Sequence, residues 1–161
     1  MGEIKKGFLP VYDANSKLLI LGSFPSVKSR QTEFYYGNKQ NRFWKTVCGF
    51  FGEDVPCDTE GKKDFLIRRN IALWDIVTEC EIVGSQDSTI KNFKTADIEK
   101  LLQNSKISFI IINGGTAFSI FEKRFADVGV PYVKLPSTSP ANTRFVQKEW
   151  IDALSAVFGR T

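Results

Sequence analysis

The segment from Tyr35 to Trp44, YYGNKQNRFW, holds the side chains best suited to chemistry in this sequence. Asn41 stands where a polar turn meets an apolar run that begins at Phe43. An amide is a poor general base, but its oxygen can accept a hydrogen bond from water and its nitrogen can donate one. The segment therefore indicates a site that orients a water or a ligand. N-capping of the following helix is the alternative role for Asn41.

The composition narrows the remaining chemistry. The 161 residues contain no histidine, which excludes histidine triads, histidine general acids and most zinc sites. The three cysteines, Cys48, Cys57 and Cys80, form no CxxC pair and are expected to be buried free thiols. They are too few for a four-cysteine iron–sulfur cluster. We therefore expect a site without metal or cofactor, built from amides, hydroxyls, carboxylates, lysine, tyrosine and backbone groups.

Length, charge and hydropathy suggest one cytoplasmic domain. The chain has the size of one domain, so residues 1–161 are expected to form a single domain, and 42% hydrophobic residues allow a substantial core. A net charge of +4 weakly favours binding to a polyanion such as nucleic acid. Taken alone, however, this charge is more typical of a soluble protein with a slight basic excess. No apolar run is long enough to span a bilayer, and the N-terminus lacks the apolar stretch of a secretory signal. We expect a cytoplasmic monomer with no membrane partner.

Apolar runs that suit strands alternate with apolar residues at helical spacing. The predicted strands are Leu18–Gly22, Phe109–Asn113 and, more weakly, residues 71–77 and Tyr132–Leu135. The predicted helices cover residues 43–51, 98–102, 117–125 and 146–157. Thr95 or Asp97 is expected to cap the second helix, and Thr116 the third. The pattern predicts an α/β fold, a three-layer α/β/α sandwich around a central, mainly parallel sheet of roughly four strands.

Ligands in such folds bind beyond the carboxyl ends of the strands, which directs attention to three loops. Residues 22–29, GSFPSVKS, suit either an anion cradle or a plain polar turn. Residues 113–116, NGGT, predict a tight strand-to-helix turn rather than a nucleotide site, because they match neither phosphate-binding motif. Residues 135–144, LPSTSPANTR, are stiffened by two prolines. They suit either a grip on a phosphate backbone or a rigid cap for the last helix.

Three segments in this order, LILGSFPS, YYGNKQNRFW and LPSTSPAN, resemble the uracil-DNA glycosylase superfamily, and within it the hypoxanthine-DNA (deoxyinosine) glycosylase branch. The IALWDIV and GSQDSTI segments also look like that branch, and the resemblance covers most of the chain. The first of these segments, LILGSFPS, differs from the corresponding motif of other branches at Phe24. Phe24 stands where mismatch-specific uracil glycosylases carry Asn, and the broad uracil-specific enzymes use an acidic residue there and a histidine in the last motif.

The resemblance implies a monofunctional DNA glycosylase of base excision repair. Such an enzyme flips a deaminated base, here hypoxanthine, out of DNA and hydrolyses its N-glycosidic bond. No motif places a lysine as a Schiff-base nucleophile, which agrees with an intact abasic product. The implied partner is double-stranded DNA with a deaminated base, and single-stranded DNA is the alternative.

The resemblance also implies roles for individual residues. Asn41 is the expected catalytic residue, and Tyr36 aligns with an aromatic that stacks on the extruded base, while one of Tyr35 and Tyr36 is expected to pack in the core. Asp75 and Asp87 are further carboxylates, each with a surface or capping role as the alternative. The residues expected to bind the substrate are Gly22, Ser23, Phe24, Tyr36 and Asn142. The residues expected to contact DNA are Ser26, Lys28, Ser29, Ser137, Thr138 and Ser139.

Three alternatives remain open. The first keeps the superfamily and changes the base to uracil, or to another deaminated base such as xanthine, including bases in mismatches. The second is a binding module that keeps the fold and recognises abasic or damaged DNA without turnover. The third is an unrelated nucleotide-handling α/β enzyme that uses the turn at residues 113–116, which nucleotide-dependent thermal stabilisation would support.

Overall fold

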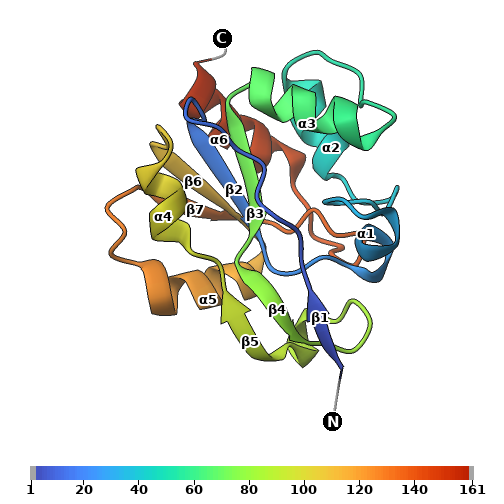
Figure 1. Cartoon of the computed structure of the whole chain (residues 1–161). Helices are drawn as coiled ribbons and strands as arrows, with labels where there is room; N and C mark the ends of the chain where they lie inside the picture. The colour runs from blue at the N-terminus through green and yellow to red at the C-terminus, as the bar shows by residue number, and fades with distance from the viewer. Residues whose placement is uncertain (1–2, 160–161) are drawn as a thin grey trace.

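A four-stranded parallel sheet lies at the centre of the computed structural model, which describes residues 3–159 (Figure 1). Its strands are, in spatial order, β3 (Ile71–Asp75), β2 (Leu18–Gly22), β6 (Phe109–Asn113) and β7 (Tyr132–Leu135). All three strand pairings are parallel. Every residue of β2 is buried, as its continuous apolar run predicts for a strand covered on both faces.

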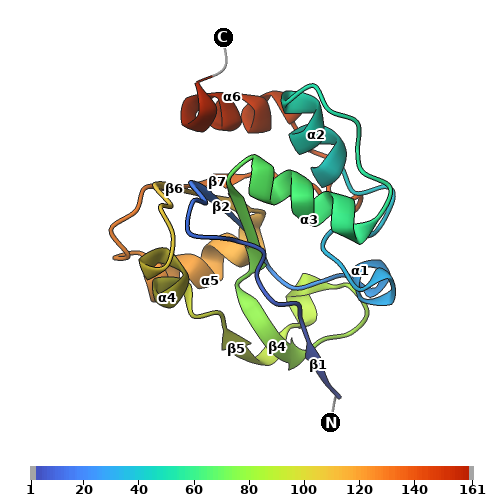
Figure 2. The same cartoon turned by 45° about the horizontal axis from the view of Figure 1, so that its top comes forward.

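Helices cover both faces of this sheet, so the predicted three-layer sandwich is confirmed (Figures 1 and 2). The helices on one face are α2 (Phe43–Phe50), α3 (Thr59–Arg68) and α6 (Gln147–Phe158), and those on the other are α4 (Ile98–Gln103) and α5 (Gly115–Phe125). Side chains alternate along β2 between the two layers: Leu18 and Ile20 pack in the first core, and Leu19 and Leu21 in the second. A short helix, α1 (Val27–Thr32), follows β2 at its carboxyl end.

A small antiparallel sheet, which the sequence did not predict, extends beyond the end of β3. Its strands are, in spatial order, β1 (Ile4–Lys6), β4 (Val77–Glu81) and β5 (Lys91–Thr95). The strand predicted at residues 71–77 is therefore wrong at its end. The Ile76 N–H donates to the Gly22 carbonyl at 2.8 Å, and the chain then leaves the main sheet. The connection from β4 to β5 contains a 3-10 turn, η1 (Asp87–Thr89), which lies beside the loop after β2.

The predicted helix starts are partly corrected. Asp97 caps α4 by accepting the Lys100 N–H at 3.1 Å, which confirms one of the two proposed caps. Thr116 is not the cap of α5, because Gly114 occupies that position with a φ of 96°, a conformation that glycine adopts without strain. Val146 is likewise the N-cap of α6 rather than its first helical residue.

Two expectations drawn from composition also meet the structure. Cys48 and Cys80 are buried free thiols, as expected, whereas Cys57 is exposed in the connection between α2 and α3, where no core covers it. Among the helices of residues 3–159, none combines the length and the hydropathy that a bilayer crossing requires.

Candidate active site

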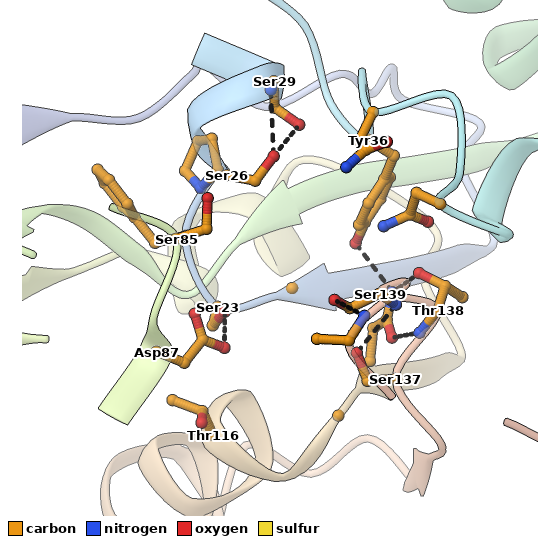
Figure 3. A pocket seen from close by; sticks show the side chains of 18 of the residues that line it. Ser23, Ser26, Ser29, Tyr36, Ser85, Asp87, Thr116, Ser137, Thr138 and Ser139 are labelled. Carbon is orange, nitrogen blue, oxygen red and sulfur yellow. Dashed lines mark hydrogen bonds between the residues drawn. The ribbon is translucent and has the colours of Figure 1, made fainter. Parts of the chain in front are cut away.

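The carboxyl ends of the parallel strands open into a pocket of about 800 Å³. The strand register places Gly22 beside Asp75 and Asn113 beside Leu135, so these residues end their strands at the same edge of the sheet. The residues selected from the sequence all line this pocket: Gly22, Ser23, Phe24, Ser26, Lys28, Ser29, Tyr36, Asn41, Ser137, Thr138, Ser139 and Asn142. Figure 3 shows the side chains of several of them converging from separate segments of the chain.

Asn41 lies in this pocket directly before α2 and keeps half of its amide free. Its Oδ1 accepts the backbone N–H of Phe43 at 2.9 Å, so the side chain braces the first turn, although Arg42 rather than Asn41 occupies the N-cap position. The backbone donor fixes which end of the amide is the oxygen. Among residues 3–159, no group accepts a hydrogen bond from Asn41 Nδ2. Asn41 can therefore donate to a ligand while its position is held.

Tyr36 supplies an aromatic wall, and its neighbour belongs to the core. The Tyr36 ring stacks on Phe43 with centroids 4.2 Å apart, and its hydroxyl accepts a hydrogen bond from Asn113 Nδ2 at 3.2 Å (Figure 3). Tyr36 has a φ of 53°, a left-handed backbone conformation that is uncommon for residues other than glycine. The stacking and the hydrogen bond hold the side chain in place in this conformation. Tyr35 is buried and donates to the Leu9 carbonyl at 2.7 Å, which confirms that one of the two tyrosines packs in the core.

Asn113 joins the end of β6 to the last of the three loops. Its Nδ2 donates to Thr138 Oγ1 at 3.0 Å, and its Oδ1 accepts the Thr138 N–H at 3.0 Å. Both residues are buried, where unpaired polar groups would be costly. The sequence analysis treated Asn113 only as part of a turn. The sequence did contain one indication of this role, because Asn113 is the single polar residue at the end of an otherwise apolar strand.

The amide of Asn142 is engaged within its own loop. Its Nδ2 donates to the Ser137 carbonyl at 2.9 Å, and its Oδ1 accepts the Arg144 N–H at 3.0 Å. Two terminal nitrogens of Arg42 donate to the Asn142 carbonyl, each at 3.1 Å, and tie this loop to the start of α2. The side chain of Asn142 thus shapes the loop, and its contact with a base stays a prediction.

The hydroxyls expected to contact DNA divide into rim groups and buried supports. Ser29 is buried, and its Oγ accepts the Gly37 N–H at 2.9 Å. Ser26 caps α1 by accepting the Ser29 N–H at 3.1 Å (Figure 3). Thr138 is fully buried, whereas Lys28 is exposed on α1. Ser29 and Thr138 therefore hold the loops that present the rim, and contact with phosphate stays a prediction for all six DNA-binding residues.

Two carboxyl groups that the sequence ranked as secondary also line the pocket. Asp75 ends β3 and is 5% exposed, which excludes a surface role for it. Burial and the neighbouring charge of Asp87 raise the pKa of Asp75 to about 8. Asp87 accepts the Ser23 hydroxyl at 2.7 Å (Figure 3), and burial raises its pKa while this hydrogen bond opposes the shift.

Gly22 leaves room for the Asp75 carboxyl and the Tyr36 hydroxyl to approach each other. A Cβ at this position would lie 2.5 Å from Asp75 Oδ1 and 2.8 Å from the Tyr36 hydroxyl oxygen. The carboxyl of β3 and the phenol of the 35–42 loop therefore face each other across the end of β2. Any larger residue at position 22 would displace one of them.

Comparison with known proteins decides the family. Residues 9–155 match the model of the Uracil DNA glycosylase superfamily. The chain belongs to that superfamily. The resemblance seen in the motifs is confirmed, and so is its general consequence, an enzyme that hydrolyses N-glycosidic bonds in DNA.

Individual relatives cover nearly the whole chain. A hypoxanthine DNA glycosylase of Methanosarcina acetivorans is 38% identical over 152 residues, which make up 91% of this chain and 96% of the relative. A hypoxanthine DNA glycosylase of Methanosarcina barkeri is 29% identical over 153 residues, which make up 92% of this chain and 97% of the relative. A solution NMR structure of a candidate uracil DNA glycosylase from Methanosarcina acetivorans has a TM-score of 0.85 at 35% identity and covers 97% of this chain and 99% of its own.

Proposed function

We propose that this protein is a monofunctional DNA glycosylase that releases hypoxanthine from deoxyinosine in DNA and leaves an intact abasic site. The observation that carries the proposal is the pocket at the carboxyl edge of the sheet, where Asn41 presents a free amide N–H and Tyr36 an aromatic ring. A pocket of about 800 Å³ can admit an extruded base with its sugar. The names of two relatives that match nearly the whole chain support hypoxanthine as the base.

The chemistry of the bond fits this arrangement. Breaking an N-glycosidic bond develops positive charge on the sugar and negative charge on the departing base. A donor that is already in place when the charge develops needs no reorganisation, and Asn41 Nδ2 is such a donor. Asn41 Oδ1 has a second lone pair that can orient the attacking water. One face of Tyr36 is backed by Phe43, and base stacking on an aromatic ring contributes roughly 1–3 kcal/mol.

The rim of the pocket supports contact with duplex DNA around the extruded base. Lys28 is exposed there, and Ser26, Ser137 and Ser139 offer hydroxyls from two facing loops. Contacts to phosphates release counterions, so affinity for duplex DNA should fall as salt rises. Binding measured by fluorescence anisotropy at several salt concentrations checks this footprint, and salt-independent affinity contradicts it. The monomeric state and the cytoplasmic location remain expectations from the sequence.

Uracil is the second candidate base, because the family and a solved relative carry it in their names. Phe24 argues against uracil and fits a different base. It lines the pocket, is 7% exposed, and stands where the mismatch-specific uracil branch carries an amide. An apolar ring at this position disfavours a water site of the uracil type.

A single-turnover excision assay tests the proposal. Duplexes carrying one hypoxanthine, uracil or xanthine are incubated with excess protein and then cleaved by alkali at abasic sites. We expect breaks at hypoxanthine with the highest rate. Breaks at uracil alone would keep the superfamily and overturn the choice of base. Tight binding to abasic DNA with no breaks on any substrate would indicate a binding module instead.

A further inference from the structure

Asp75 is a buried carboxyl group that the proposed roles of Asn41 and Tyr36 do not use. It is 95% buried at the end of β3, yet it lines the pocket. Its Oδ1 lies over Gly22, in the space that a side chain at position 22 would fill. Within residues 3–159, no hydrogen bond reaches its side chain. A buried polar group without a protein partner, facing a pocket, is placed to bind a ligand.

Burial, and after it the charge of Asp87 in η1, disfavours the ionised form of Asp75. Tyr36 and Tyr35, from the loop before α2, are the other titratable groups near it, and both stay neutral at ordinary pH because burial raises the pKa of each. The carboxyl of Asp75 in turn raises the pKa of both tyrosines, after the larger effect of their own burial. Lys28 is the only cation among the described pocket residues, and it is exposed on α1. Burial without a cationic partner therefore keeps Asp75 in its acid form at neutral pH.

We propose that Asp75 is the proton donor to the base that leaves. This inference rests on the proposed excision of hypoxanthine and adds a second catalytic residue to it. A purine that departs as an anion is a poor leaving group. Protonation of a ring nitrogen, N7 or N3, lets it depart as a neutral molecule, and general acids of this kind contribute about 10²- to 10⁴-fold in rate.

The step balances without any further reactant. The bond between C1′ and N9 breaks, and its electron pair stays with the base. The Asp75 O–H bond also breaks, and its proton is transferred to the ring nitrogen of the base. Water forms a new bond to C1′ and loses a proton to solvent, and the Asp75 carboxylate regains a proton from solvent. The net products are an abasic site and free hypoxanthine.

The two carboxyl groups then have different roles in one pocket. Asp87 holds a hydrogen bond from the Ser23 hydroxyl, which stabilises its ionised form. Asp75 has no such donor and lies deeper. Two carboxyl groups whose environments separate their pKa values are a recurring acid and base arrangement. Burial is the larger cause of the raised pKa of Asp75, and charge repulsion by Asp87 adds to it.

The test is the pH dependence of single-turnover excision of hypoxanthine by the wild type, Asp75→Asn and Asp87→Asn. The wild-type rate should fall as the pH rises through about 8, because the acid form of Asp75 is then lost. Asp75→Asn should lower the rate by roughly 10²-fold near pH 7 and remove this fall. Asp87→Asn removes the repelling charge, so the fall should move to lower pH.

A second measurement places the proton acceptor on the substrate. Duplexes with 7-deazahypoxanthine or 3-deazahypoxanthine lack one ring nitrogen each. Loss of the nitrogen that Asp75 protonates should slow the wild type strongly and slow Asp75→Asn much less, which is the non-additivity of groups that act together. Binding of an abasic-site duplex by Asp75→Asn within about threefold of the wild type would show that the variant is folded.

The outcomes separate the two proposals. Excision by the wild type, with Asp75→Asn close to it in rate and in the midpoint of its pH profile, overturns the role of Asp75 and keeps the glycosylase. Excision that Asp75→Asn slows without a change in that midpoint also overturns proton donation, because a merely structural role would give that result. Absence of hypoxanthine excision by the wild type at every pH overturns the proposed function and this inference with it.

Discussion

Two sets of side chains in the pocket differ in how firmly the protein holds them. The amide wall consists of Asn41, Asn113 and Asn142, and each of these amides has at least one hydrogen bond to backbone or side chain. The carboxyl wall consists of Asp75 and Asp87. Its hydrogen bonding among residues 3–159 is limited to the contact between Ser23 and Asp87.

Because amides do not titrate and carboxyl groups do, the two walls are expected to have different roles. Amides do not titrate, so an amide wall whose members are each held by at least one hydrogen bond can keep its geometry over a wide pH range. Burial raises the pKa of both carboxyl groups, and Asp75, with a pKa of about 8, changes charge within the working range of an enzyme. We therefore expect the amide wall to set whether excision occurs, and the carboxyl wall to set how it depends on pH. The variants below test this division, from the largest expected effect to the smallest.

Asn41→Ala should reduce the single-turnover rate of excision by about 10²- to 10³-fold, the usual loss when one preorganised donor is removed. The cost in folding should stay near 1 kcal/mol, because one acceptor for the Phe43 N–H disappears. Asn142→Ala is the matched control, since its amide is engaged within its own loop, and it should slow excision less. A rate for Asn41→Ala within threefold of the wild type would remove Asn41 from the mechanism.

Gly22→Ala should slow excision by about 10²-fold, because the added methyl displaces Asp75 or Tyr36 and misplacement of about 1 Å has this scale of effect. The sheet itself should survive, which thermal unfolding followed by circular dichroism checks. Gly115→Ala is the control. Gly115 also lines the pocket, but a Cβ there meets nothing within 4 Å. Equal losses in the two variants would contradict the close approach over Gly22.

Asp75→Asn should change how stability depends on pH. The pKa of Asp75 in the folded protein, about 8, lies above its usual value of 3.8, so the folded state binds this proton more tightly than the unfolded state. The stabilising contribution of the protonated group is fully present below the usual value and is lost as the pH rises through about 8. The Tm of the variant minus that of the wild type should therefore increase from pH 4 to pH 9. A constant difference would show that Asp75 is not held in its acid form.

Tyr36→Phe should have the smallest effect. It removes the hydroxyl that accepts from Asn113 Nδ2, but that nitrogen keeps its bond to Thr138, so the loss in stability should be about 1 kcal/mol. The stacked ring remains, and excision should stay within about threefold of the wild type. Tyr36→Ala removes the ring and should slow excision further, by an amount set by the stacking energy of roughly 1–3 kcal/mol. Equal rates for the two variants would mean that the base does not stack on this ring.

The parts of the site that the sequence predicted are those carried by short contiguous segments. The apolar runs of β2 and β6 indicated buried parallel strands, and the loops at their ends had to lie at one edge of the sheet. Asn41 was found because a polar turn met an apolar helix. The pocket therefore contains every site residue selected from those loops.

The remaining parts depend on contacts between segments that are distant in the chain. Ser23 and Asp87 are 64 residues apart, and their hydrogen bond exists only because the chain leaves the main sheet after Asp75 and returns through η1. Asn113 could not be recognised as the partner of Thr138 and Tyr36 from a motif of its own. The pKa of Asp75 depends on burial, which no local pattern reports.

The most direct measurement is the fate of base and strand when the protein acts on a duplex with one deoxyinosine. Hydrolysis predicts free hypoxanthine in amounts equal to the abasic sites formed, and an uncut strand until alkali is added. Intact deoxyinosine under conditions of saturating binding would contradict the central claim that this pocket hydrolyses the N-glycosidic bond. Strand cleavage without alkali would contradict the monofunctional mechanism.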